Sequence, residues 1–295
     1  MRTFVTGASG FVGTWLTRHL EACGDTVYPL RDEFDIADEA AVAREAATAA
    51  PEVIYHLAGL ADVRRSWEIP AETFRVNALG TLVLCEVARQ LVPRPRVILV
   101  SSAEVYGIAG GVPLGEETPL RPVTPYAASK VAAEYVGLQA FLGHGLEVVR
   151  VRPFNHVGPG QAESFVVSAL ARRVVEAERA GTDEIRVGDL SSARDFTDVR
   201  DVVRAYRLLA GLGRPGEVYN VCSGVAVPIR SVLDEIVALA ARPVSPIEDP
   251  ALRRPVELPV LVGDASKLVA LTGWKAEIPL RQTLVDVLAA VRERA

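Results

Sequence analysis

The sequence predicts an α/β protein in which a Rossmann-type, doubly wound parallel sheet is joined to a smaller, partly discontinuous C-terminal domain. Up to about residue 153, short β-branched runs alternate with amphipathic helical stretches, which is the rhythm of repeated strand–helix–strand units. The expected strands show little polar alternation, as when helices cover both faces of a sheet. Beyond residue 153 the rhythm breaks and prolines punctuate the chain, so a second domain is expected there.

The expected strands are β-branched runs, and the expected helices are amphipathic segments bounded by start and stop signals. Strands are expected at about 3–5, 26–28, 53–57, 97–100, 147–151 and 218–221, and helices at about 11–22, 38–49, 71–91, 125–143, 164–180, 199–211 and 280–293. Residues 1–158 are expected to form the sheet domain, to which residues 188–224 return. Residues 159–187 and 225–295 are expected to form the second domain.

Composition and charge exclude several classes of protein. The chain has 295 residues, 49% hydrophobic and 23% charged, with a net charge of −5, so we expect neither nucleic acid nor a membrane surface as a partner. No apolar run approaches the ~18 residues of a membrane-spanning helix, and no secretion signal is expected. Cys23, Cys85 and Cys222 lack metal-ligand spacing. We therefore expect no metal site, and free thiols in a reducing cytoplasm.

A glycine-rich loop follows the first expected strand. Gly7, Gly10 and Gly13 recur at every third position, and Phe11 and Val12 begin the next helix. Glycines let the backbone approach a pyrophosphate, and the helix N-terminus offers free N–H groups and the positive end of a dipole. Because the motif joins the first strand to the first helix, we interpret it as a dinucleotide-binding loop rather than an ordinary turn.

The end of the second strand is the expected position of the group that contacts the adenosine ribose. Arg31 comes first there, and a guanidinium suits the 2′-phosphate of NADP. The acidic residues Asp32 and Glu33 follow directly, which keeps NAD possible. Asp35 and Ile36, expected at the end of a third strand, either meet the adenine edge or lie in an ordinary surface turn.

Tyr126 and Lys130 form a Tyr-x-x-x-Lys pattern on a helix that Thr124 can cap and Pro125 can start. Four residues apart, their side chains share a face. An ammonium favours the ionised form of a neighbouring phenol, so we expect Lys130 to lower the pKa of Tyr126 and fit it for acid–base catalysis. The alternative is a core tyrosine beside a solvated lysine. Lysine is scarce in this arginine-rich chain, which favours a specific role for Lys130.

The strand that ends at Val100 runs into Ser101, Ser102 and, two residues later, Glu104. Hydroxyls at the C-terminal edge of a parallel strand project into the ligand crevice. Ser102 is therefore expected to hydrogen-bond a reacting carbonyl beside Tyr126. Glu104 is either a second acid–base group or an exposed carboxylate. His56, at the end of a buried strand, is expected to be a satisfied core histidine.

In combination, these motifs resemble the extended short-chain dehydrogenase/reductases that act on nucleotide sugars. The shared features are Gly7-x-x-Gly10-x-x-Gly13, His56-Leu57-Ala58-Gly59, Asn77 in Val-Asn-Ala-Leu-Gly-Thr, Ser102 to Gly107, and Tyr126 to Lys130. The second half is similar to the GDP-4-keto-6-deoxymannose reductases and the related GDP-mannose 4,6-dehydratases at residues 152–161, 194–201, 218–224, 263–268 and 272–274. Ala103 departs from dTDP-glucose-type dehydratases, which carry an acid there.

The resemblance implies the roles of many residues. Catalysis would fall to Ser102, Tyr126 and Lys130, with Glu104 beside them. The cofactor, NADP or NAD, would be bound by Gly7, Gly10, Phe11, Val12, Gly13, Arg31, Asp35, Ile36, Leu57, Ala58, Gly59, Asn77, Ser101, Tyr126, Lys130 and Pro153. The nucleotide sugar would be bound by Ser102, Glu104, Tyr126, Asn155, Phe165, Val166, Arg172, Arg194, Arg254 and Glu257.

The resemblance also implies an activity: NAD(P)H-dependent reduction of the C4 ketone of a GDP-4-keto-6-deoxyhexose. The partner would be a GDP-linked or other nucleotide-linked sugar, held by the second domain, while the first domain holds the dinucleotide. A GDP-mannose 4,6-dehydratase, a nucleotide-sugar 4-epimerase and a non-catalytic dinucleotide sensor stay open as alternatives. A homodimer formed through the helices at about 76–91 and 125–143 is implied as well.

Overall fold

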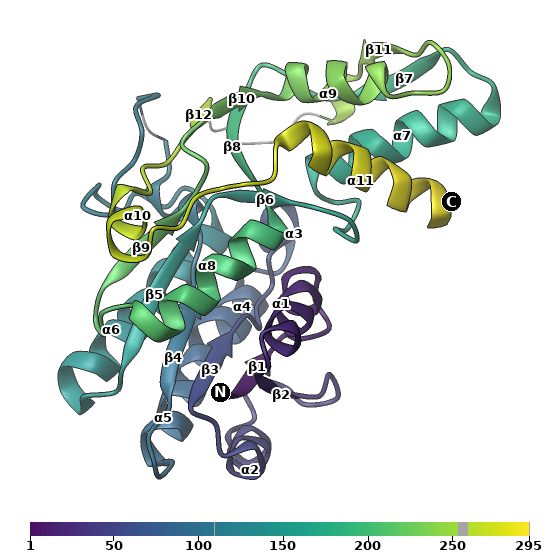
Figure 1. Ribbon diagram of the computed structural model, residues 1–295. Coiled ribbons are helices and arrows are strands. Elements are labelled where there is room, and N and C mark those ends of the chain that lie inside the picture. Colours follow the sequence, from purple (N-terminus) through teal and green to yellow (C-terminus); the bar gives the residue numbers. More distant parts are fainter. Residues whose placement is uncertain (109, 253–258, 295) are drawn as a thin grey trace.

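A six-stranded parallel sheet forms the centre of the computed structural model, which describes residues 1–108, 110–252 and 259–294 (Figure 1). Its order is β2-β1-β3-β4-β5-β9, and every neighbouring pair is parallel. The strands are β1 (Arg2–Thr6), β2 (Thr26–Pro29), β3 (Val53–His56), β4 (Arg96–Val100), β5 (Val148–Pro153) and β9 (Val218–Val221). The predicted α/β fold class is confirmed. Because β2 and β3 lie on opposite sides of β1, a ligand crevice is expected at the carboxyl ends of β1 and β3.

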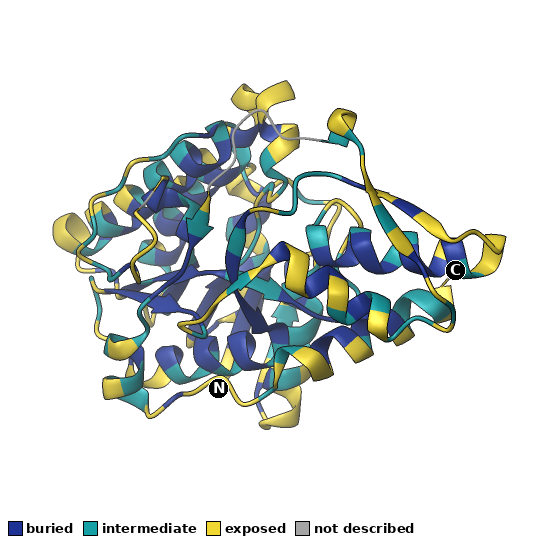
Figure 2. Ribbon diagram, turned by 90° about the horizontal axis from the view of Figure 1, so that it is seen from above, coloured by how far each residue is buried: buried dark blue, intermediate teal, exposed yellow. Residues whose placement is uncertain are grey.

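Helices bury both faces of this sheet, because successive strand residues point to opposite sides. Phe4 and Ile54 belong to one apolar core, whereas the next residues, Val5 and Tyr55, belong to another. The first core is shared with α2 (Glu39–Ala49), α5 (Gly80–Gln90) and α6 (Pro125–His144), and the second with α1 (Phe11–Ala22) and α8 (Val199–Leu212). Figure 2 shows the strands buried between helices whose outer faces are exposed. The strands lack polar alternation for this reason.

A third apolar core lies in the upper part of Figure 1, away from the sheet. Residues of α7, β7, α9 and α11 form most of it. The elements of this part are α7 (Val166–Ala180), β7 (Glu184–Val187), α9 (Ile229–Ala238), β11 (Ser245–Glu248) and α11 (Leu280–Arg294). β7 and β11 pair in parallel. The chain therefore builds a second packed body from segments that are distant in sequence.

A small sheet around β8 connects the two bodies. Its strands are β6 (Asn155–Val157), β8 (Ala193–Asp198), β10 (Ala226–Pro228) and β12 (Val260–Leu261). Two buried acids of β8 hold this junction together. Asp195 accepts hydrogen bonds from the Ser223 hydroxyl at 2.6 Å and the Gly263 N–H at 3.2 Å, and Asp198 caps α8 and accepts from the Thr283 hydroxyl at 2.7 Å.

Two expected elements differ in the structure. The single helix expected at about 71–91 is divided, and the strand expected to end at Asp35 and Ile36 is a pair of turns. Asp35 accepts a hydrogen bond from the Ala37 N–H at 2.9 Å, which stabilises the turn.

The short elements are α3 (Val63–Glu68), α4 (Pro70–Phe74), the π-helix η1 (Arg75–Leu79), the 3₁₀-helices η2 (Ala103–Tyr106) and η3 (Pro250–Leu252), and α10 (Ser266–Thr272). No helix in the described ranges has the length and apolarity needed to span a membrane.

Replacement of Gly13 by alanine tests the close packing of α1 on the glycine loop. A Cβ at Gly13 would lie 2.1 Å from the backbone oxygen of Gly7, and backbone yields less readily than a flexible side chain. We expect Gly13→Ala to lower the free energy of unfolding by about 1–3 kcal/mol in chemical denaturation. Gly211→Ala, within α8, is the control, because nothing lies within 4 Å of its Cβ position. An unchanged Gly13→Ala protein would contradict this packing.

Candidate active site

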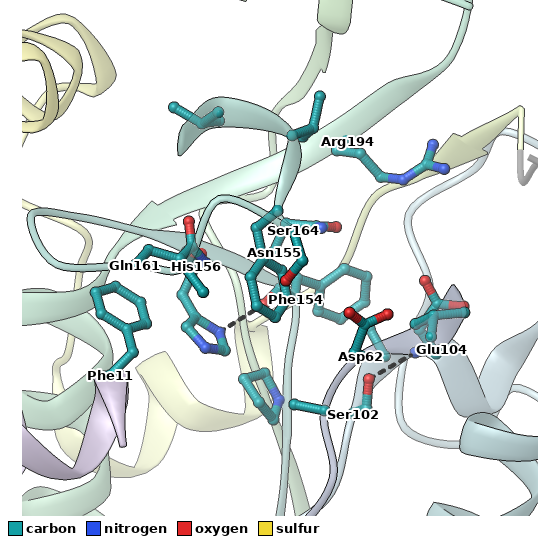
Figure 3. A pocket seen from close by; sticks show the side chains of 18 of the residues that line it. Phe11, Asp62, Ser102, Glu104, Phe154, Asn155, His156, Gln161, Ser164 and Arg194 are labelled. Carbon is teal, nitrogen blue, oxygen red and sulfur yellow. Dashed lines mark hydrogen bonds between the residues drawn. The ribbon is translucent and has the colours of Figure 1, made fainter. Parts of the chain in front are cut away.

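A cleft of about 840 Å³ lies where the sheet meets the second body, a volume typical of small-molecule sites. Its lining comes from the glycine loop, the segments after β3 and β4, the start of α6, and β6, α7 and β8. Figure 3 shows Phe11 beside His156 in one region of the cleft. Ser102, Asp62 and Glu104 gather in another region, with Arg194 above them in this view.

The glycine loop forms one wall of the cleft. Gly7 has a φ of 70°, a left-handed conformation that favours glycine, and its carbonyl accepts a hydrogen bond from the Gly10 N–H at 3.2 Å. α1 begins after Gly10 without a side-chain cap. The predicted residues Gly7, Gly10, Phe11, Val12 and Gly13 all line the cleft. The uncapped N-terminus of α1 therefore faces the cleft, where it suits an anion.

Tyr126 is buried in the cleft wall at the start of α6, and Ser102 lines the same cleft. Thr124 caps the helix by accepting a hydrogen bond from the Ala127 N–H at 3.0 Å. Burial raises the pKa of Tyr126 to about 12, the charge of Glu104 adds to the rise, and the Ser102 hydrogen bond opposes it. The expectation of a lowered tyrosine pKa is therefore wrong, because removal of water from the phenol outweighs the other effects.

The Lys130 ammonium is buried in the same wall and donates a hydrogen bond to the Val100 carbonyl at 3.0 Å. Burial lowers the pKa of Lys130 to about 8, and the negative charge of Glu134 opposes this fall. Gly59 leaves room for the ammonium, since a Cβ there would lie 3.3 Å from Lys130 Nζ and 2.9 Å from Asn77 Oδ1. A glycine in this loop thus permits close packing of two polar groups.

Two buried polar side chains lie behind the cleft wall. His56 contacts the Thr6 hydroxyl at 2.8 Å and the Thr81 hydroxyl at 3.0 Å. Burial, aided by the charge of Lys130, lowers the pKa of His56 to about 3, so it is a neutral core histidine, as expected. Asn77 accepts a hydrogen bond from the Leu60 N–H at 2.8 Å. Asn77 holds the loop after β3 in place and is not part of the cleft lining.

The residues expected at the adenosine do not line the cleft. The Arg31 side chain is 55% exposed and pairs with Glu45 at 3.2 Å. Asp35 pairs with Arg75 at 2.6 Å, at the surface. Ile36 is buried against α5 in an apolar core, which leaves its side chain no access to an adenine edge. Arg31 alone among these three presents an exposed group of the kind expected at a ribose phosphate.

Most of the other expected binding residues line the cleft. These are Leu57, Gly59, Ser101, Glu104, Pro153, Asn155, Phe165, Val166 and Arg194; Ala58 does not. Arg172 lies elsewhere, since it pairs with Glu176 at 2.6 Å and lines a small separate cavity. The next residue, Arg173, lines the cleft instead, because each helical residue is rotated by about 100° from the last. Arg254 and Glu257 fall outside the described residues.

Several cleft residues were not predicted from the sequence. Asp62 caps α3 by accepting a hydrogen bond from the Arg65 N–H at 3.0 Å. His156 stacks on Phe11 with ring centroids 6.1 Å apart; its place in the segment after Pro153 was the signal that could have identified it. The Tyr206 hydroxyl is buried and has no hydrogen-bond partner among the described residues. Tyr206 lies on an amphipathic helix, where a tyrosine indicates only a core position.

Known proteins share this architecture. A family model described as GDP-mannose 4,6 dehydratase matches residues 32–287. A GDP-6-deoxy-D-mannose reductase of Pseudomonas aeruginosa is 36% identical over 293 residues, which cover 98% of this chain and 96% of that protein. The structure of RMD from Pseudomonas aeruginosa complexed with NADPH matches with a TM-score of 0.92 and 34% identity, over 100% of both chains. The UDP-glucose 4-epimerase of Thermus thermophilus in complex with NAD matches with a TM-score of 0.88 and 29% identity, over 100% of both chains.

Replacement of Lys130 by methionine tests the burial of the ammonium. The pKa of Lys130 is lowered from 10.5 to about 8, so below pH 8 the folded protein carries the full cost of a buried charge. We expect Lys130→Met to raise the free energy of unfolding at pH 7 by about 1–3 kcal/mol. The gain should shrink between pH 8 and pH 10, as the folded parent loses this proton and becomes more stable relative to its unfolded state.

Denaturation curves at pH 7 and pH 9.5 measure both effects. Lys267→Met is the matched control, because Lys267 lies at the surface beside Glu217 and its neutralisation should give no gain. A Lys130→Met protein that is less stable than the parent at pH 7 would contradict the burial argument.

Proposed function

Because this chain belongs to the GDP-mannose 4,6 dehydratase family, we propose that it reduces the C4 ketone of a GDP-4-keto-6-deoxyhexose with NADPH or NADH. The proposal rests on one observation: Ser102, Tyr126, Lys130 and the glycine loop line the same cleft. The 36% identity to a GDP-6-deoxy-D-mannose reductase, over nearly the whole length of both proteins, supports this choice of substrate.

The residues of the cleft fit a dinucleotide. The uncapped N-terminus of α1 suits a pyrophosphate, and the glycines let it approach the backbone. Tyr206 lies among the residues that line the same cleft. We place Lys130 at the hydroxyls of the nicotinamide ribose. When bound, the reduced nicotinamide supplies a hydride.

We assign NADP as the preferred cofactor through Arg31. Its guanidinium is mostly exposed and is paired with Glu45 at 3.2 Å and Glu33 at 3.1 Å. Such surface pairs stabilise a protein little, so Arg31 can turn to a 2′-phosphate at small cost. NAD stays possible, because the two acids that neighbour Arg31 are also suited to ribose hydroxyls.

In this mechanism Tyr126 is the proton donor. Its pKa of about 12 keeps the phenol protonated at neutral pH, so it can donate a proton to the C4 oxygen as negative charge develops there. Ser102, whose hydroxyl acts on the phenol, orients the same oxygen. The Lys130 ammonium, with a pKa of about 8, is mostly charged at pH 7 and stabilises the tyrosinate that remains. Tyr126 is then reprotonated from solvent.

We place the GDP moiety against α7 in the second body, and we propose residues 159–187 and 225–295 for this domain, apart from Leu268 and Trp274, which pack in a core of the sheet. Asn155 and Arg194 line the cleft and are assigned to the diphosphate, since a guanidinium matches phosphate geometry. Arg173, which lines the cleft, takes the position at the base that the resemblance implied for Arg172. The sheet domain, residues 1–158 and 188–224, is assigned to the dinucleotide, except for Asn155 and Arg194, which are assigned to GDP.

One observation favours a second candidate, GDP-mannose 4,6-dehydratase activity. Glu104 lines the cleft, and its backbone N–H donates to the Ser102 hydroxyl at 3.2 Å. Elimination of water requires a second acid–base group near the sugar, and the Glu104 carboxylate is suited to that task. A 4-epimerase uses the same tyrosine and lysine, and the Thermus thermophilus enzyme shares the fold.

Cofactor consumption tests the proposal. Purified protein given GDP-4-keto-6-deoxymannose and NADPH should consume NADPH, which is followed by its absorbance. Tyr126→Phe removes the proton donor and should lower kcat by about 10²–10⁴-fold. Tyr135→Phe is the control, because Tyr135 lies on the exposed face of the same helix. Turnover of GDP-mannose without consumption of NADPH would instead establish a dehydratase, and NADPH binding without any turnover would support a sensor.

We also propose a homodimer formed through α5 and α6. These neighbouring helices pack together and expose apolar side chains, with Leu82 39% and Tyr135 59% exposed. Leu82→Glu should convert the dimer to a monomer in light scattering, because it buries a charge in the interface. Leu212→Glu is the control, since Leu212 ends α8 on the opposite side of the sheet and is 51% exposed. A monomeric parent protein would refute the dimer.

A further inference from the structure

Glu134 is a third side chain on the face of α6 that carries Tyr126 and Lys130. Glu134 follows Lys130 by four residues, as Lys130 follows Tyr126, so the three side chains share one face of the helix. Glu134 has 0% exposure. A fully buried carboxylate is costly unless it is paired and hydrogen-bonded, so its partners indicate its task.

Arg152 is the principal partner of Glu134. Its Nε donates to Oε1 at 2.8 Å and its Nη2 to Oε2 at 2.7 Å, a bidentate pair of the strongest kind. Arg150, the other cation of β5 near this carboxylate, lies 3.9 Å away. Arg152 in turn donates to Tyr106 Oη at 3.0 Å, and the Tyr106 hydroxyl donates to Asn220 at 2.8 Å. The carboxylate is thus held by β5 and, through Tyr106, by β9.

The remaining contact of Glu134 reaches the end of β4. The Ser101 hydroxyl donates to Glu134 Oε1 at 2.6 Å. Its neighbours on both sides also interact with this helix, because Val100 accepts from Lys130 at 3.0 Å and the Ser102 hydroxyl acts on the pKa of Tyr126. Val100 and Ser101 are therefore hydrogen-bonded to two side chains of one helical face, and Ser102 interacts with the third.

We propose that Glu134 is a positioning residue of the reaction centre, which fixes the end of β4 to α6 through Ser101 and supplies the negative charge that keeps Lys130 protonated. Glu134 does not line the cleft, so it acts through Ser101, Ser102 and Lys130 rather than on a ligand. The inference rests on the proposed function for its consequence in catalysis. Its effect on the pKa of Lys130 does not depend on which substrate the protein binds.

The charges around Lys130 support this assignment. On its own helix the ammonium faces Glu134, which raises its pKa, while burial lowers it. From β3 it faces His56, which is neutral near pH 7 because its pKa is about 3. The cations of β5, Arg150 and Arg152, lie at the Glu134 carboxylate, at 3.9 and 2.7 Å. Loss of the Glu134 carboxylate therefore removes the negative charge that opposes the effect of burial on the Lys130 pKa. Lys130 should then release its proton at a lower pH.

Lysine-selective NMR tests the charge effect without substrate. The chain has lysine only at positions 130, 267 and 275, so protein labelled with ¹³C at lysine Cε gives three signals, assigned with Lys267→Arg and Lys275→Arg. In the parent, one signal should titrate near pH 8. In Glu134→Gln that midpoint should fall by about 1 pH unit or more. An unchanged midpoint would overturn the proposal.

Two further variants keep this test interpretable. Glu134→Gln leaves Arg152 without a counter-charge and can destabilise the fold, so Glu134→Gln/Arg152→Met, which removes both charges, should fold and still show the lowered midpoint. Glu147→Gln is the matched control: Glu147 pairs with Arg96 at 2.7 Å on the surface, and its loss should leave all three titrations unchanged.

Kinetics connect the charge to the reaction. With the ketosugar and NADPH, the alkaline fall of kcat should move to lower pH in Glu134→Gln, while KM changes little, because the cleft lining is intact. Glu134→Asp retains the charge and should restore the parent pH profile. A uniform loss of kcat at every pH, with the Lys130 titration unmoved, would reduce Glu134 to a structural role. The NMR result holds or fails whether or not the ketosugar is the substrate.

Discussion

The junction between the end of β4 and one face of α6 is the constraint on which the site depends. Val100 and Ser101 are hydrogen-bonded to Lys130 and Glu134 of that helix, and the Ser102 hydroxyl interacts with Tyr126. A strand in the middle of a parallel sheet and a helix packed on it are both rigid, so groups fixed to them need little further ordering. The phenol, the hydroxyl and the ammonium therefore share one frame in the cleft that the glycine loop also lines.

Burial acts on the two titratable groups in opposite directions. It raises the pKa of Tyr126 to about 12 and lowers the pKa of Lys130 to about 8, because an apolar environment favours the neutral form of each. At neutral pH the result is a protonated phenol beside an ammonium that is mostly charged. That combination suits donation of a proton to a carbonyl oxygen, followed by stabilisation of the tyrosinate. Exclusion of water keeps the phenol protonated, whereas Lys130 stays charged because Glu134 opposes the effect of burial on its pKa.

The acidic residues divide into structural and chemical groups. Asp195, Asp198 and Glu134 are buried and fully engaged in hydrogen bonds or ion pairs, so they join strands and helices. Asp62 and Glu104 line the cleft, where a carboxylate can meet a ligand. The segment Arg194 to Asp198 contains both kinds of residue, since Arg194 lines the cleft while the two acids hold β8 to its neighbours. This segment therefore contains one residue that can bind a ligand and two residues that stabilise the fold.

The sequence by itself determined the elements and the residues that local spacing defines. Alternating β-branched and amphipathic runs predicted the parallel sheet, and the positions of Gly7, Gly10 and Gly13, together with the four-residue interval from Tyr126 to Lys130, predicted one wall of the cleft. These features follow from helix and strand periodicity, which adjacent residues establish. They needed no knowledge of long-range contacts.

Only the tertiary structure decided what distant segments do to one another. The pairing of Glu134 with Arg152, the cleft position of Tyr206 and the exchange of Arg172 for Arg173 depend on how helices pack and rotate against strands. The direction of the Tyr126 pKa shift depended on how completely the fold excludes water. Burial and through-space charge arise from residues brought together by packing, so sequence spacing does not carry them.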